Sequence, residues 1–196
     1  NLDLRSDLAD RIATVDGVAG ITPLRYFDAG WRTPDGDDAI ISIRAVDPGT
    51  FTQVSSFVFA DEDTDAAQVM RRLQEGGAVL ISSVITERYG LHPGDSLLLR
   101  TSSGWHEFKI AGVVIDYFNQ GLSLQISWND MRRWFRINDA STFMVRVAEG
   151  YSADEVEERI DDLYGQRNWL VIESNLSFRQ RIQVLVPEPT ETLEPH

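Results

Sequence analysis

A helix, a glycine and a strand follow one another at both ends of this chain, and this repeated unit limits the architectures open to it. The triplet DRI at 10–12 is separated by four residues from Gly17, and the triplet ERI at 158–160 is separated by the same number from Gly165. A strand is predicted after each glycine. Two such units suggest one layer of two helices on a sheet, with a middle segment, 50–138, inserted between them.

The fold class predicted from this pattern is α+β. One helix-and-sheet subdomain is expected from residues 1–49 and 139–186 together, and a second, β-rich subdomain from the inserted residues 50–138. Residues 187–196 contain three prolines. They are therefore expected to be a linker or a tail foreign to the natural protein.

Local signals in the sequence predict the individual helices, strands and turns. Asp65 and Ser152 are predicted helix N-caps, Glu155 completes a capping box, and Gly90 ends a helix. Pro93-Gly94 favours a type II turn before a hairpin. Helices are predicted at 4–15, 65–75, 83–89, 129–135, 152–165 and 175–186; strands at 21–27, 39–46, 78–81, 97–101, 105–116, 122–126, 142–147 and 169–172; a loop at 28–38; and a turn at 47–49.

Charge and composition exclude several classes of function. The net charge of −13 disfavours nucleic acid and anionic lipid headgroups as partners, because both need a basic surface. The acidity also has a plainer interpretation, which is that it keeps the domain soluble. The chain has no cysteine, which removes thiol chemistry and disulfides. No apolar run reaches the ~18–20 residues of a membrane helix, and the chain is expected to be a piece of a larger protein.

No catalytic, cofactor-binding or metal-binding constellation can be recognised. His92, His106 and His196 have no partner at ligand spacing. The acidic run at 61–65 lacks the glycine and glutamate of a calcium loop, and no phosphate-binding loop or nucleophile elbow occurs. The sequence therefore predicts a protein that is not an enzyme and holds no cofactor or metal.

Aromatic residues outside the expected core are the candidates for a binding surface. Trp31 falls in the predicted loop, and Tyr117 and Phe118 follow the end of a predicted strand. Exposed aromatic side chains commonly mark the surface that contacts a protein partner. We therefore single out these three residues as partner-binding candidates, whereas the aromatic residues between Trp128 and Phe135 are expected to pack in the core.

The stretch 78–116, AVLISSVITERYGLHPGDSLLL followed by FKIAGVVID, resembles the extracytoplasmic core domain of MacB/FtsX/LolC-type ABC transporter permeases. The order is a short strand, a helix ending in Tyr-Gly, a Pro-Gly-Asp turn, and a hairpin that closes in Ala-Gly-Val-Val. Three flanking features also agree with the family: Gly-Val at 17–18 after the first helix, Ala-Val-Asp-Pro at 45–48 after the second strand, and Ser-Asn at 174–175 at the start of the last helix. The resemblance extends to about residue 185 and departs from the efflux branch at 28–38 and 50–64, which are expected to face a partner.

This resemblance implies a domain on the periplasmic or extracellular side of the cell membrane, between two membrane helices of a permease. The subdomain made from both chain ends would then be porter-like, and the helices at 4–15 and 175–186 would continue into the membrane spans. The parent would be dimeric and would work with a cytoplasmic ABC ATPase to move or activate an external lipid, lipoprotein, efflux substrate or protein partner. Two alternatives are a stand-alone extracellular binding or adaptor module and an acidic extracellular hydrolase.

Overall fold

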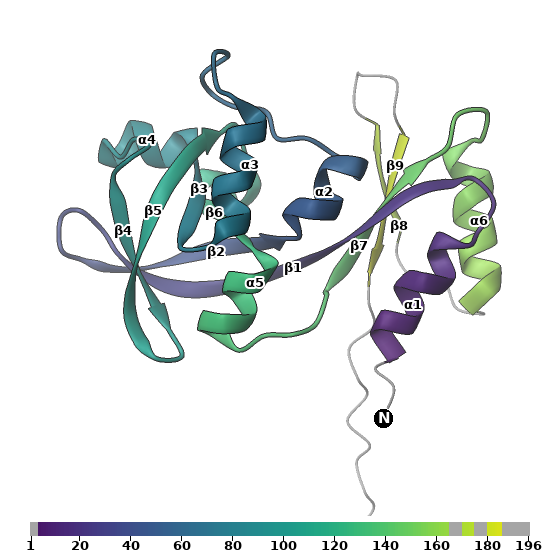
Figure 1. Cartoon of the computed structure of the whole chain (residues 1–196), viewed down its shortest axis with the longest axis horizontal. Helices are drawn as coiled ribbons and strands as arrows, with labels where there is room; N and C mark the ends of the chain where they lie inside the picture. Colours follow the sequence, from purple (N-terminus) through teal and green to yellow (C-terminus); the bar gives the residue numbers. More distant parts are fainter. Residues whose placement is uncertain (1–3, 165–169, 175–179, 186–196) are drawn as a thin grey trace, which may run out of the picture.

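The computed structural model describes residues 4–164, 170–174 and 180–185 (Figure 1), and it combines helices with a twisted sheet. The helices are α1 (Leu4–Ala13), α2 (Pro48–Val54), α3 (Ala66–Glu75), α4 (Ser83–Tyr89), the 3-10 turn η1 (Phe118–Gly121), α5 (Trp128–Asp130), the π-helical turn η2 (Met131–Phe135) and α6 (Ala153–Tyr164). The strands are β1 (Val18–Arg32), β2 (Asp38–Val46), β3 (Ala78–Ser82), β4 (Ser96–Thr101), β5 (Gly104–Val114), β6 (Ser123–Ser127), β7 (Thr142–Val147), β8 (Leu170–Ser174) and β9 (Gln180–Leu185).

Six of these strands close into a ring. The order β2-β6-β3-β5-β4-β1 runs around it, and an antiparallel pairing of β1 with β2 completes the closure. Every second residue of each strand points inward, as in a small barrel whose interior is filled by side chains. The interior includes Ile41, Ile43, Val79, Ile81, Leu97, Leu99, Phe108, Ile110, Leu124 and Ile126.

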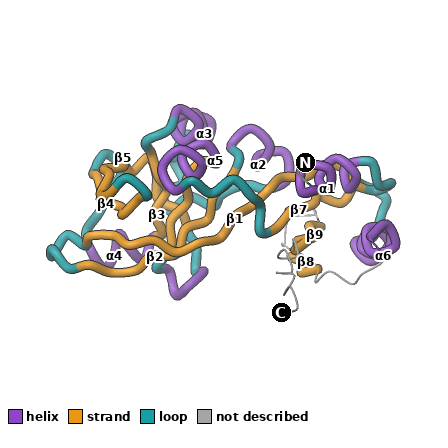
Figure 2. The backbone as a smooth tube through the Cα atoms, turned by 90° about the horizontal axis from the view of Figure 1, so that it is seen from below, coloured by secondary structure: helices purple, strands orange, loops and turns teal. Residues whose placement is uncertain are grey.

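Outside the ring, α2 and α3 lie side by side and cover one face of the strands (Figures 1 and 2). Leu73 of α3 and Phe51 of α2 are completely buried there, together with Leu80 of β3. Leu80 and its neighbours Val79 and Ile81 belong to opposite faces of one strand. Strand β3 is therefore buried on both faces, as its uninterrupted apolar sequence predicts.

The second part of the molecule is a sheet of β1, β7, β9 and β8 with α1 and α6 packed against it (Figure 1). Ile12 of α1, Val145 of β7 and Ile160 of α6 share one buried cluster. Both chain ends thus contribute to a helix-and-sheet unit, as the repeated pattern predicts. Strand β1 joins the two parts, because residues 18–24 pair with β7 and residues 24–32 pair with β2. The division at 1–49, 50–138 and 139–186 stays a prediction.

Most of the local signals are confirmed. The Asp65 side chain accepts from Gln68 N, and Gly90 ends α4 in the left-handed conformation. At α6, Glu155 N donates to Ser152 Oγ at 3.1 Å and Ser152 N donates to Glu155 Oε2 at 3.2 Å, which is the predicted reciprocal capping box. The caps predicted at Asp65, Gly90 and Ser152 are therefore confirmed.

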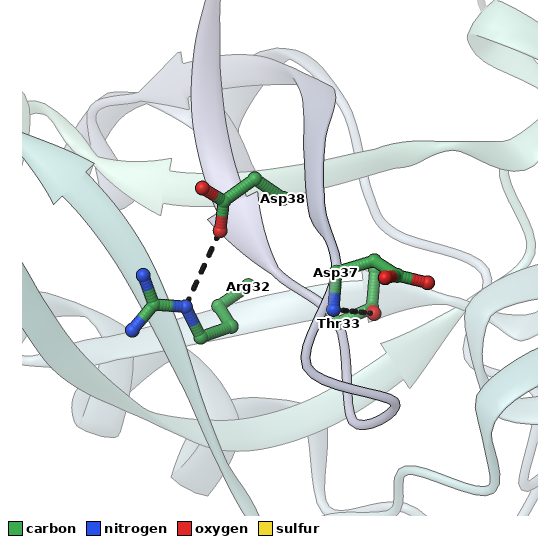
Figure 3. A network of polar contacts seen from close by, with 4 residues as sticks. All are labelled: Arg32, Thr33, Asp37 and Asp38. Carbon is green, nitrogen blue, oxygen red and sulfur yellow. Dashed lines mark hydrogen bonds and ion pairs between the residues drawn. The ribbon is translucent and has the colours of Figure 1, made fainter.

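The predicted loop at 28–38 is wrong. Strand β1 continues to Arg32 and β2 begins at Asp38, which leaves a tip of only 33–37. Cross-strand pairing stabilises these polar residues as strand: Ser42 Oγ donates to Asp28 Oδ1 at 2.9 Å. At the tip, Arg32 Nε donates to Asp38 Oδ1 at 3.3 Å, and the Thr33 hydroxyl accepts from Asp37 N (Figure 3).

The turn predicted at 47–49 is the first turn of a helix that the sequence analysis missed. Asp47 is the N-cap of α2, its side chain accepts from Gly49 N at 3.1 Å, and Pro48 occupies the first helical position. Proline is favoured there because the first helical N–H has no partner within the helix.

The predicted C-terminal helix at 175–186 is also wrong, because residues 180–185 form strand β9. This strand pairs antiparallel with β7 on one side and with β8 on the other. Within 180–185, Ile182 and Leu185 fit a helical spacing while Ile182 and Val184 fit the alternation of a strand, so the apolar pattern does not separate the two. The two neighbouring strands decide the outcome by offering hydrogen-bond partners along both edges. Residues 175–179, Gly165 and the tail at 187–196 lie outside the described residues.

Candidate functional site

Trp31 is not a surface residue, which corrects its assignment as a partner-binding candidate. Its side chain is 1% exposed and lies in the core of the barrel, edge-on to the ring of Tyr89 with 5.1 Å between ring centroids. The reason is the continuation of β1, which places Trp31 opposite Ala39 on one side and Leu99 on the other. In this fold Trp31 stabilises the barrel rather than a contact with another molecule.

The other two candidates are exposed and belong to a larger apolar surface. Tyr117 is 75% exposed and Phe118 is 48% exposed. Val58 and Ile115 are also exposed, at 58% and 43%, and Ile115 stands two residues before Tyr117 in the chain. Ile115 N donates to Val58 O at 2.8 Å, and the antiparallel bridge between Phe59 and Val114 sets Val58 opposite Ile115. We call Val58, Ile115, Tyr117 and Phe118 the apolar patch.

The turn that follows the apolar patch has an unusual backbone conformation. Asn119 and Gln120 have φ of 51° and 58°, and Gly121 has φ of 82°. The left-handed conformation costs about 1–2 kcal/mol for a residue with a side chain. Local hydrogen bonds offset this cost, because Asn119 Nδ2 donates to Leu122 O at 3.2 Å and Leu122 N donates to Asn119 O at 3.1 Å. Such a conformation persists only where the surroundings hold it in place.

Gly121 anchors this turn to the barrel. A Cβ added at Gly121 would lie 2.5 Å from the Cβ of Val84 in α4, so the position has no room for a side chain. The Ser82 hydroxyl donates to Gly121 O. Phe118 is held at the other end of the turn, where its ring packs against Tyr26 with 5.2 Å between centroids. The two aromatic residues are therefore presented by a fixed turn.

Asp116 links the apolar patch to the interior of the fold. Its Oδ1 accepts from Phe118 N at 3.0 Å, and its Oδ2 accepts from Gln125 Nε2 at 3.0 Å and from Ser123 Oγ at 3.3 Å. Gln125 Oε1 in turn accepts from Arg44 Nε at 2.6 Å. This carboxylate is used structurally, since it orders the backbone that carries Phe118.

Val58 and Ile115 were not among the candidates predicted from the sequence. The run of four apolar residues at 57–60 was the available signal, because it stands between Ser56 and Asp61 outside any predicted helix or strand. Its partner, Ile115, is 57 residues away in the chain. Only the folded structure brings the two together.

A model of one protein family matches residues 2–163, and its description is the MacB-like periplasmic core domain. The match includes the whole barrel, the apolar patch and α6 up to Leu163.

The chain belongs to the family of MacB-like periplasmic core domains. It is therefore an extracytoplasmic domain of a MacB/FtsX-like ABC transporter permease, and the family functions in transport. A permease of this family implies an ATPase partner through the parent protein. Among the described helices, none has the length and apolar character that crossing a bilayer requires.

Two solved structures share the fold of this MacB-like domain. The extracellular domain of the noncanonic ABC-type transporter YknZ from Gram-positive bacteria is 18% identical, with a TM-score of 0.56 and coverage of 83% of this chain and 85% of that one. The periplasmic region of MacB from Actinobacillus actinomycetemcomitans is 11% identical, with a TM-score of 0.59 and coverage of 84% and 76%. Comparison with curated protein sequences gave no match.

Asp130 and His106, two ionisable residues near one another, have structural partners in this MacB-like domain. Asp130 Oδ2 accepts from Gly77 N at 2.8 Å, and burial raises the pKa of Asp130 although this bond and the nearby Arg133 and His106 lower it. His106 stacks on Trp134 with 3.6 Å between ring centroids. Within the described residues, no group of three or more His, Cys, Asp or Glu side chains could hold a metal ion.

Proposed function

We propose that this MacB-like domain is a non-catalytic element that couples ATP-driven motion of the membrane helices of its parent permease to a cargo or partner outside the membrane. The partner class is a lipid, a lipoprotein, an efflux substrate or an external protein, and the parent acts as a dimer. The proposal rests on the family and on the path of the chain.

The path of the chain carries the proposal. Strand β9 ends at Leu185, opposite Thr142 of β7, which itself pairs with Leu24 of β1. Helix α1 runs back from the Val18 end of β1 toward the same level. Figure 1 shows α1 beginning and β9 ending at the lower edge of the molecule. Two connections that leave at one edge can both receive motion from neighbouring membrane helices.

The apolar patch lies toward the other side of the molecule. Strand β5 ends at the upper edge in Figure 1, next to the start of α3, and the apolar patch follows directly from the end of β5. A domain with connections at one edge and an exposed aromatic surface at the other is suited to transmit movement to a partner. We assign Tyr117 and Phe118 to this contact.

The test is a flexible insertion in the parent permease. Four residues, Gly-Ser-Gly-Ser, placed immediately before Leu4 would separate α1 from the segment that precedes it without changing the packing of α1. We expect the permease to retain its ATPase activity and to lose transport, because movement of the membrane helix would be absorbed by the linker.

The matched control is the same insertion between Ser103 and Gly104. Both residues are exposed in the turn between β4 and β5, and nothing lies within 4 Å of a Cβ added at Gly104. This variant should transport like the wild type. Normal transport by the Leu4 insertion variant, in a protein that is folded and membrane-inserted, would show that α1 does not transmit the motion.

A further inference from the structure

The two chain segments that supply the apolar patch are acidic, and this favours a partner of opposite charge. The segments 45–70 and 110–127 supply its four residues and the chain around them, and they contain no Lys, Arg or His. The same segments contain six carboxylates: Asp47, Asp61, Glu62, Asp63, Asp65 and Asp116.

Three of these carboxylates form an acidic rim beside the apolar patch. Ala60 N donates to Val113 O at 2.9 Å, which fixes the chain at the point where the exposed residues Asp61, Glu62 and Asp63 begin. Asp61 Oδ1 accepts from Asp63 N at 2.9 Å, so the rim is itself an ordered turn. We call Asp61, Glu62 and Asp63 the acidic rim.

One cation near the apolar patch, Arg44, is already engaged. The Arg44 guanidinium lies over the rings of Phe51 and Phe57, at 5.6 and 5.8 Å from their centroids, and its Nε donates to Gln125. Helix α4, which contacts η1, carries Glu87 and Arg88, one charge of each sign. Carboxylates are thus the only charged groups that segments 45–70 and 110–127 themselves supply.

We propose that the apolar patch and the acidic rim together form a docking surface for a basic, amphipathic segment of another protein, in which apolar side chains cover Tyr117 and Phe118 while Lys or Arg residues face the rim. This inference rests on the proposed function and names the kind of partner that meets the domain outside the membrane. Charge complementarity selects the partner, since the apolar side chains supply contact area and the opposite charge steers the encounter.

Charge also argues against the other occupants. A second copy of this chain carries the same net charge of −13 and would bring its own carboxylates to the contact. An anionic lipid surface would be repelled for the same reason. The fixed turn at Asn119 and Gln120 favours a preformed site, because residues already held in place lose little conformational freedom when a partner binds.

The experiment uses two synthetic peptides of about 18 residues, enough for five helical turns. One has Leu at the apolar helical positions and Lys elsewhere, and its matched control has Glu in place of Lys. Each is titrated into the isotope-labelled 196-residue chain, and backbone amide shifts report the site and the affinity. We expect the Lys peptide to shift the amides of Val58 and of residues 115–118, and the Glu peptide to cause no shifts.

Variants assign the two parts of the docking surface. Tyr117→Ser with Phe118→Ser should weaken binding of the Lys peptide by about tenfold or more, as loss of aromatic anchors does. Ile40→Ser removes an equally exposed apolar residue from β2 and should leave affinity unchanged. Tyr117→Ser alone serves if the double variant melts at a lower temperature.

The acidic rim is tested by a pair of matched variants. Glu62→Gln with Asp63→Asn should weaken binding by roughly twofold to fivefold per charge at low salt and reduce the dependence on salt. Asp35→Asn with Asp37→Asn removes two exposed carboxylates at the tip of the β1–β2 hairpin and should change affinity far less.

Several results would overturn the proposal. Shifts centred elsewhere, equal binding of the Glu peptide, or wild-type affinity in the Tyr117→Ser variants would each remove the docking surface. Self-association that these variants abolish would make a second copy the occupant, and binding to phosphatidylglycerol vesicles would make it a lipid. The insertion before Leu4 does not change the apolar patch. If that insertion abolishes transport while the Tyr117→Ser variants bind the Lys peptide as the wild type does, the docking surface is refuted and the proposed function stands.

Discussion

Replacing Gly121 by alanine tests how the turn beneath the apolar patch is held. The left-handed φ of 82° costs about 1–2 kcal/mol for a residue with a side chain. The new Cβ would lie 2.5 Å from Val84 Cβ, and forcing a methyl group into a packed position costs about 1–3 kcal/mol more. Together Gly121→Ala should lower the free energy of unfolding by about 2–5 kcal/mol, which urea denaturation can measure.

Gly94→Ala is the matched control, because Gly94 has φ of 94° but nothing lies within 4 Å of an added Cβ. This variant should lose only the conformational part, about 1–2 kcal/mol. In a Val84→Ala background, the cost of Gly121→Ala should fall, since two of the three nearest atoms are gone. Equal losses for the glycine variants at 94 and 121 would refute close packing against α4 as the reason for Gly121.

Three further variants test single interactions, each by urea denaturation. Asp130→Asn keeps an acceptor for Gly77 N. Burial raises the pKa of Asp130 above its ordinary 3.8, so the wild type should lose stability relative to this variant as pH rises above about 4, and a relative gain in stability over that range would contradict this. Glu157→Gln should stabilise α6 by about 0.2–0.5 kcal/mol, because burial and the repulsion from Asp161 raise the pKa of Glu157; a loss would mean that the charge is favourable. Ser152→Ala should cost about 1 kcal/mol through the lost N-cap, and an unchanged midpoint would rule out the cap.

The sequence by itself determined the features whose partners lie within a few residues of each other. The caps at Asp65 and Ser152 and the left-handed glycines at 90 and 94 all follow from interactions over one to four residues. The same holds for the exposure of Tyr117, which stands where a strand ends and a turn begins. Short-range rules suffice there because the chain satisfies its own backbone groups locally.

Features set by distant neighbours could not be predicted in this way. In strand β7, Met144 is buried beneath α2, a helix that the sequence did not predict. Trp31 is a core residue because β1 continues to Arg32 between its neighbours β2 and β4. Residues 180–185 form a strand because β7 and β8 pair with them on either side.

The candidate site also contains both kinds of feature, those set by nearby residues and those set by distant ones. Tyr117 and Phe118 could be selected from the sequence, whereas Val58 joins them only through its pairing with Ile115 on another segment. The tertiary structure decided these points because hydrogen bonds and apolar burial depend on which surfaces meet, and two surfaces far apart in the chain meet only when the whole ring of strands closes.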